Sequence, residues 1–194
     1  MSTYDQRRDV RKKIMLRKLF HFSGIIIPVI YLLTEKQTAL IVTSAIFVVD
    51  IVLETLRIKG FMNVAFIEEN MKKEESNRPS GSFFYVLSGL ITIIFFKKNI
   101  AISSLFILSI ADPLSSLLGS RFGRVRLFGK SLEGSIIFFA TSFLILWIFS
   151  FSIPIAVAGA IIASLTELFS SRPIDDNLSI PLVTALALTL LTRF

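Results

Sequence analysis

The sequence predicts an all-α integral membrane protein with about seven transmembrane helices. Of its 194 residues, 53% are hydrophobic and 19 are Phe, which is more apolar than a soluble domain usually is. The mean hydropathy is +0.72. Long apolar runs recur along the whole chain, as expected of helices that cross a bilayer. There is no cysteine, which excludes a disulfide framework and a thiolate metal site.

The predicted spans follow one another with mostly short connections. A basic stretch precedes the first apolar run, and because no small-residue cleavage site follows that run, we expect a retained helix. Several runs are shorter than the roughly 20 residues that a hydrocarbon core needs, and local thinning or burial among neighbouring helices can accommodate them. The spans are roughly 17–34, 38–57, 82–97, 99–118, 133–151, 153–169 and 178–193.

The segment between the second and third spans, residues 60–76, has apolar side chains at helical spacing, among them Phe61 and Val64, with charged residues between them. This pattern predicts one amphipathic helix at the membrane interface, or equally an ordinary solvated linker helix. We expect a basic cytoplasmic segment, residues 1–16, followed by a single polytopic membrane domain, residues 17–194.

The basic residues predict the orientation of the chain. Seventeen of the 21 Lys and Arg residues lie in the N-terminal segment and in the loops after spans two, four and six. Loops rich in Lys and Arg stay cytoplasmic, so we expect the N-terminus inside and the C-terminus outside. The formal charge of +7 is therefore ascribed to loops held against anionic lipid rather than to a nucleic-acid partner.

The acidic residues converge on the same side, where all but one of the 14 lie. Ionisable groups at membrane depth are costly and usually mark a site or a path. A transporter is expected to place polar groups near the midplane, but here the midplane is almost purely apolar. The residues concerned include Asp50, Glu54, Asp112, Glu133, Glu167, Asp175 and Asp176, with Asn177 beside them, and Arg17 and His21 share a face of the first span.

The loop after the fourth span has the residue types of a phosphate-binding segment. It is not a soluble P-loop, because a transmembrane helix precedes it and five residues, rather than four, separate Gly123 from Gly129. Its glycines permit close backbone approach, and Ser131 can cap the next helix, whose N-terminus favours an anion. An ordinary basic cytoplasmic loop is the alternative. The candidate residues are Gly119, Arg121, Gly123, Arg124, Arg126, Gly129, Lys130 and Ser131.

Carboxylates near this loop predict a magnesium site. An Asp inside an apolar span is rare, and Pro113, directly after Asp112, removes a backbone donor and is expected to kink or break the helix. Asp112, Glu167 and Asp176 would offer oxygen ligands suited to Mg²⁺, which prefers carboxylates together with phosphate oxygens and water. The pair Asp176-Asn177 also fits a helix N-cap.

Motifs over nearly the whole chain from about Arg17 carry a resemblance to a known family. The central motif is Asp112-Pro-Leu-Ser-Ser-Leu-Leu-Gly-Ser-Arg-Phe-Gly123, followed by Gly129-Lys-Ser-Leu-Glu-Gly-Ser135, and three shorter motifs flank it: Arg17-Lys-Leu-Phe-His21, the pair Glu54 and Arg57, and Glu167 with Asp175-Asp-Asn-Leu-Ser-Ile-Pro181. Together they resemble the CTP-dependent lipid kinases, which comprise dolichol kinase, phytol and farnesol kinase and the CTP-using diacylglycerol kinase. Ala111 stands where that family often has Gly.

The resemblance implies that the γ-phosphoryl group of CTP is transferred to the hydroxyl of a membrane lipid alcohol at the cytoplasmic interface. The alcohol would be a polyprenol or dolichol, phytol or diacylglycerol, with a slight preference for an isoprenoid. The implied roles are phosphate binding for Lys130, Arg121 and Arg124, Mg²⁺ binding for Asp112 and Asp176, and activation of the hydroxyl for Glu54 or Glu133. Asn177 and Glu167 would support the metal or the base, and Gly119, Gly123 and Gly129 would let the loop close on the nucleotide.

Other interpretations stay open at this point. His21, the only His, fits an interfacial hydrogen-bonding group as well as a base, and with Arg17 and Arg57 it is a further candidate for the site. A cytidylyltransferase would use the same nucleotide and metal. A lipid or ion transporter, or a membrane scaffold, would explain less of the acidic cluster. Nothing in the sequence indicates an oligomeric state.

Overall fold

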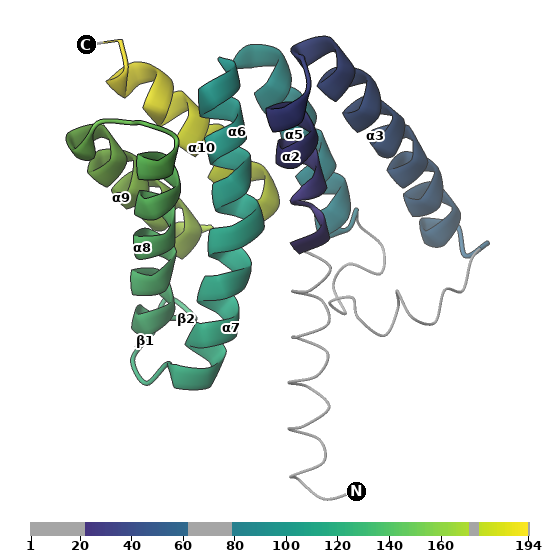
Figure 1. Cartoon of the computed structure of the whole chain (residues 1–194). Coiled ribbons are helices and arrows are strands. Elements are labelled where there is room, and N and C mark those ends of the chain that lie inside the picture. Colours follow the sequence, from purple (N-terminus) through teal and green to yellow (C-terminus); the bar gives the residue numbers. More distant parts are fainter. Residues whose placement is uncertain (1–21, 62–78, 171–174, 194) are drawn as a thin grey trace, which may run out of the picture.

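The computed structural model describes residues 22–61, 79–170 and 175–193. These ranges are helical apart from the connections and one small hairpin, which confirms the all-α prediction (Figure 1). The helices are α2 (Ile26–Leu33), α3 (Lys36–Ile58), α5 (Gly81–Phe95), α6 (Lys98–Phe106), the π-helical η2 (Ile107–Ala111), α7 (Asp112–Phe122), α8 (Leu132–Ile148), α9 (Ile153–Phe169) and α10 (Asp176–Leu191), and the strands are β1 (Arg126–Leu127) and β2 (Lys130–Ser131).

The segments α6, η2 and α7 form one continuous helix, Lys98–Phe122. The sequence predicts that Pro113 kinks or breaks this span, but the helix continues through it. The π turn that ends at Ala111 places Pro113 in the first turn of α7. Because a π turn changes the local hydrogen-bond register, and because a proline is tolerated in a first turn, the missing N–H does not interrupt the helix.

The other helices surround this long helix (Figure 1). Neighbouring pairs in the bundle are α7 with α8, α8 with α9, α9 with α10, and α10 with α5, whereas α3 lies at the edge and packs against α5 and α2. The hairpin lies at one end of the bundle, and α10 ends at the other (Figure 1). Counting Lys98–Phe122 as one, the described ranges contain seven helices.

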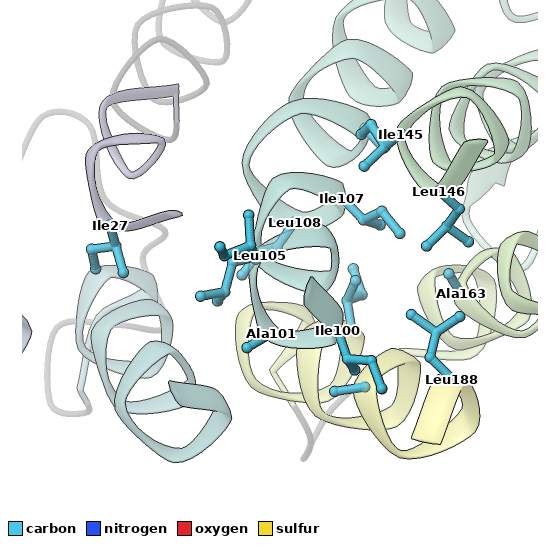
Figure 2. Close-up of a cluster of buried hydrophobic side chains, with 14 of the residues drawn as sticks. Ile27, Ile100, Ala101, Leu105, Ile107, Leu108, Ile145, Leu146, Ala163 and Leu188 are labelled. Atoms are coloured by element: carbon cyan, nitrogen blue, oxygen red, sulfur yellow. The ribbon is translucent and has the colours of Figure 1, made fainter. Parts of the chain in front are cut away.

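Aliphatic side chains from most of the helices fill the centre of the bundle, and Figure 2 shows part of this core. Small residues let α9 approach its neighbours closely, as is common between membrane helices. A Cβ added at Gly159 would lie 2.9 Å from both Leu146 and Leu188. The labelled core residues are Ile27, Ile100, Ala101, Leu105, Ile107, Leu108, Ile145, Leu146, Ala163 and Leu188.

The outer surface of the bundle is apolar. Large hydrophobic side chains are exposed on several helices, for example Ile41 at 70%, Val48 at 60% and Trp147 at 57%, and a surface of this kind fits lipid better than water. Two helices, α3 and the continuous Lys98–Phe122, are long and apolar enough to cross a membrane. The four shorter apolar helices are α5, α8, α9 and α10. Seven spans, and the orientation of the termini, stay a prediction, and the amphipathic segment 60–76 lies almost wholly outside the described residues.

Candidate functional site

The loop after α7 folds into a two-stranded hairpin. Arg126 pairs with Ser131, and Leu127 pairs with Lys130. Between them, Phe128 and Gly129 have φ values of 49° and 86°, as in a two-residue type I′ turn. The exposed ring of Phe128 lies 5.2 Å from the ring of Phe169, centroid to centroid, which joins the tip to the end of α9. The one local sign of this hairpin in the sequence is the Gly at the second turn position.

Three glycines bring α7 and the first turn of α8 into close contact. A Cβ at Gly119 would lie 2.5 Å from Ser131 Oγ, and one at Gly134 would lie 3.0 Å from the Ser115 carbonyl oxygen. A Cβ at Gly123 would overlap the carbonyl oxygen of Gly119. The structure therefore gives Gly119 and Gly123 a packing role between two helices, whereas Gly129 stands in open space. Their role at a nucleotide stays a prediction.

Replacing Gly119 by Ala is expected to destabilise the protein by about 1–3 kcal/mol, because the new methyl group must displace Ser131 from a well-packed contact. The measurement is the thermal midpoint in detergent. Ser120→Ala is the matched control, since Ser120 is the exposed neighbour of Gly119 and bonds the Leu117 carbonyl of its own helix. An unchanged midpoint in Gly119→Ala would contradict the packing role.

Ser131 and Glu133 fix the turn between the hairpin and α8. Ser131 Oγ accepts a hydrogen bond of 3.1 Å from the Gly134 N–H, so the predicted N-cap of this helix is confirmed. Glu133 Oε1 accepts hydrogen bonds from the N–H groups of Arg124, at 2.8 Å, and Val125, at 3.4 Å. Glu133 thus holds the chain between α7 and β1 through one of its two carboxylate oxygens.

Lys130 and Glu167 form an ion pair that joins the hairpin to α9. Lys130 Nζ lies 2.6 Å from Glu167 Oε1 and also donates to the Glu167 carbonyl oxygen. The Glu167 side chain is 6% exposed and that of Lys130 is 27% exposed. The sequence assigned one residue to phosphate and the other to the metal, and nothing in it indicated that the two side chains meet.

The carboxylates predicted to hold Mg²⁺ gather near this pair. Asp112 is buried at the start of α7, and both Asp112 and Asp176 are close enough to Glu167 to interact electrostatically with its carboxylate. Glu167 Oε2 and Asn177 Oδ1 are buried oxygens without a hydrogen-bond partner. Within the described ranges, no group of three or more His, Cys, Asp or Glu residues is arranged to hold a metal ion. The oxygen donors fit a Mg²⁺ ion that shares phosphate oxygens and water, and not a cage of protein ligands alone.

Three arginines around the hairpin are exposed: Arg121, Arg124 and Arg126. The guanidinium of Arg121 lies over the ring of Phe122, 5.4 Å from its centroid. The ion pairs found among the described residues are Lys130–Glu167 and Arg57–Glu54, and neither involves these arginines. Arg17 and His21 lie outside the described residues.

A second polar group lies around the first turn of α5. Glu54 and Arg57 of α3 form the pair that their spacing predicts, with Glu54 Oε2 2.5 Å from Arg57 Nη2 and 3.1 Å from Nε. Asp50 Oδ1 accepts a hydrogen bond of 3.1 Å from Ser82 Oγ, which lies 2.7 Å from Ser80 Oγ. On the other side of this turn, a Cβ at Gly81 would lie 2.8 Å from Asn177 Nδ2. No role was assigned to Asp50, Ser80 or Ser82 from the sequence.

Asp175 caps α10. From the sequence, Asp176-Asn177 could be either the cap of this helix or a pair of ligands. Asp175 Oδ1 accepts a hydrogen bond of 2.9 Å from the Asn177 N–H and is the N-cap, and Asp176 Oδ1 lies 3.1 Å from the same nitrogen. The cap is therefore one residue earlier than the sequence indicated. This turn places the buried Asn177 side chain against α5.

Comparison with known proteins identifies relatives over most of the chain. An uncharacterised protein of Rickettsia prowazekii is 33% identical over 94% of this chain and 95% of its own length. CTP-dependent diacylglycerol kinase 1 of Saccharomyces cerevisiae is 25% identical over 88% of this chain and 70% of its own length. Dolichol kinase of the same yeast is 30% identical over 66% of this chain, which corresponds to 26% of that enzyme.

The chain belongs to the CTP-dependent lipid kinase family. The resemblance of its motifs to this family is thereby confirmed. No family model matches the sequence, and no solved structure matches the fold. The names of the two yeast lipid kinases specify different acceptors, a diacylglycerol and a dolichol, so membership of the family does not by itself select the acceptor.

Proposed function

We propose that this lipid kinase transfers the γ-phosphoryl group of CTP to the hydroxyl of a membrane lipid alcohol, a polyprenol or dolichol, phytol or diacylglycerol, at the cytoplasmic interface. The observation that carries the proposal is the Lys130–Glu167 pair, with Asp112 and Asp176 close by, at the end of an otherwise apolar bundle. A charged group in this position can bind a soluble nucleotide while the lipid stays in the bilayer. The Lys- and Arg-rich loops support a cytoplasmic location for this end.

The cations would bind the phosphates. Lys130 is partly exposed, so its ammonium group can be shared between Glu167 and a phosphate oxygen. Arg121 and Arg124 reach the same end of the bundle from the loop that Glu133 holds. Phosphoryl transfer requires mainly that the protein position the reacting groups and stabilise the charge on the phosphates. These residues would do both.

Asp112, Asp176 and Glu167 would hold Mg²⁺, with Asn177 supporting them. When bound, Mg²⁺ neutralises charge on the transferring phosphoryl group. In the reaction, the lipid hydroxyl oxygen bonds to the γ-phosphorus while the bond from that phosphorus to the β–γ bridging oxygen breaks. CDP leaves, the phosphorylated lipid stays in the bilayer, and the hydroxyl proton passes to a carboxylate or to water.

The test is a radiolabel assay on the purified full chain in detergent with Mg²⁺. Given γ-³²P-CTP, the protein is expected to label at least one lipid from a panel of polyprenol, phytol, farnesol and diacylglycerol, and γ-³²P-ATP is expected to give no label. The lipid that accepts the label identifies the substrate. Label transferred instead from α-³²P-CTP to a phosphorylated lipid would make the protein a cytidylyltransferase, and no transfer from either nucleotide would refute the proposal.

A further inference from the structure

Asp50 lies on the most peripheral helix of the bundle. Its helix, α3, lies at the edge of the bundle and packs against α5 and α2 (Figure 1). Only Ala39, Thr43 and Glu54 of this helix are buried. The residues on either side of Asp50 along the chain, Val49 and Ile51, are 58% and 39% exposed, and Leu53 is 43% exposed. A carboxylate on a helix with such an apolar surface is costly within a membrane and marks a functional position.

The contacts of Asp50 leave it able to accept another hydrogen bond. Oδ1 accepts from Ser82 Oγ, but Oδ2 is buried and has no partner. Phe47 lies one turn before Asp50 on α3, and Phe83 directly follows Ser82 on α5. Their rings contact each other, with centroids 5.4 Å apart. A polar group with one unused oxygen therefore lies beside an aromatic pair, between α3 and α5.

The two other carboxylates considered for the lipid hydroxyl are less suited to it than Asp50. Glu54 accepts from Arg57 through two donors. Glu133 accepts from the backbone of the loop through Oε1 and also has an unpartnered Oε2, but it lies at the start of α8, beside the hairpin, and not beside α3. Asp50 is the carboxylate that combines a free oxygen with a place next to the apolar surface of α3. It was not among the site residues expected from the sequence.

The first turn of α5 connects Asp50 to the phosphate-binding end. Ser82 contacts Asp50 on the side of α3, and the preceding residue, Gly81, contacts Asn177 on the side of α10. Asn177 follows Asp176, which interacts with Glu167. One turn further along α5, Tyr85 bonds Ser109, which lies three residues before Asp112. These contacts place Asp50 at about the same depth as the carboxylates.

We propose that Asp50 and Ser82 bind the hydroxyl group of the lipid alcohol, which enters sideways from the bilayer between α3 and α5. This inference rests on the proposed kinase function and assigns its acceptor site. The hydroxyl donates a hydrogen bond to Asp50 Oδ2, and the Phe47–Phe83 pair contacts the first carbons of the tail. The negative carboxylate repels a phosphate group, so the site prefers the neutral alcohol to the phosphorylated product.

Steady-state kinetics of Asp50→Asn test this assignment. We expect KM for the lipid alcohol to rise roughly 10- to 100-fold, as for the loss of a hydrogen bond to a charged group, while the Kd for CTP, measured without lipid, stays unchanged. Ser82→Ala, at an exposed position, is expected to shift the same KM in the same direction by less. Thr55→Ala is the matched control, because Thr55 is exposed on the same helix and bonds its own backbone at Ile51.

A photoreactive lipid alcohol with a diazirine beside the hydroxyl gives a second measurement that needs no variant. Cross-links are expected at Phe47, Phe83 and their neighbours, whereas cross-links confined to α8 and α9 would overturn the inference. If the wild-type protein is active and neither Asp50→Asn nor Ser82→Ala changes the KM for the lipid, the inference is overturned as well. The kinase function would then still stand. A wild-type protein that phosphorylates no lipid refutes the proposed function, and this assignment with it.

Discussion

Asp112→Asn is expected to reduce lipid phosphorylation by at least about 10³-fold and to leave the protein folded. Asn has nearly the shape of Asp, so the start of α7 and the helix through Pro113 keep their packing. What changes is one negative charge, at a side chain that is only 3% exposed and that interacts with Glu167. A metal ion contributes several kcal/mol of charge stabilisation to the transition state, and each 1.36 kcal/mol corresponds to a factor of ten in rate.

The measurement is kcat/KM for CTP with the lipid that the wild-type protein accepts, together with the thermal midpoint in detergent. Ser120→Ala on the same helix is the control, and it should retain both wild-type values. Normal turnover in Asp112→Asn would show that this carboxylate has no part in the reaction. If the activity and the thermal midpoint both fall, Asp112 has a structural role in the bundle instead.

Features that depend on local spacing could be predicted from the sequence. The apolar runs predicted the helices, and Ser131 predicted the start of α8, because a cap depends on three neighbouring residues. Glu54 and Arg57 are three residues apart, which places them on one face of a helix, and they pair. The motif around Asp112 also predicted the family, which the comparisons confirm.

Features that depend on packing between distant segments could not be predicted. Lys130 and Glu167 are 37 residues apart, and Asp50 and Ser82 are 32 residues apart, so only the arrangement of the helices brings each pair together. The glycines of the central motif were assigned to a loop that closes on the nucleotide, and their packing between α7 and α8 was not expected, because close contact between these helices has no local signal. Pro113 suggested a break because the π turn before it depends on the packing of η2 and not on a sequence rule.

Lys130→Ala is expected to reduce both activity and stability, for two separate reasons. Loss of one cation that stabilises transition-state charge typically reduces kcat by about 10²- to 10³-fold. The same change leaves the buried Glu167 carboxylate without its partner, and breaking a buried ion pair in this way destabilises a protein by about 3–5 kcal/mol. A single variant therefore cannot separate the phosphate role of Lys130 from its structural role.

The double variant Lys130→Met with Glu167→Gln separates the loss of stability from the loss of activity. It removes both charges of the pair and keeps side chains of similar size, so the thermal midpoint should recover most of what Lys130→Ala loses, while kcat/KM stays low. Lys36→Ala is the matched control, because Lys36 is an exposed lysine that donates to a backbone carbonyl, that of Ile94, and it should stay active. If the double variant regains activity along with stability, both the phosphate role of Lys130 and the metal role of Glu167 are refuted, and the phosphate must be bound by the arginines near the hairpin.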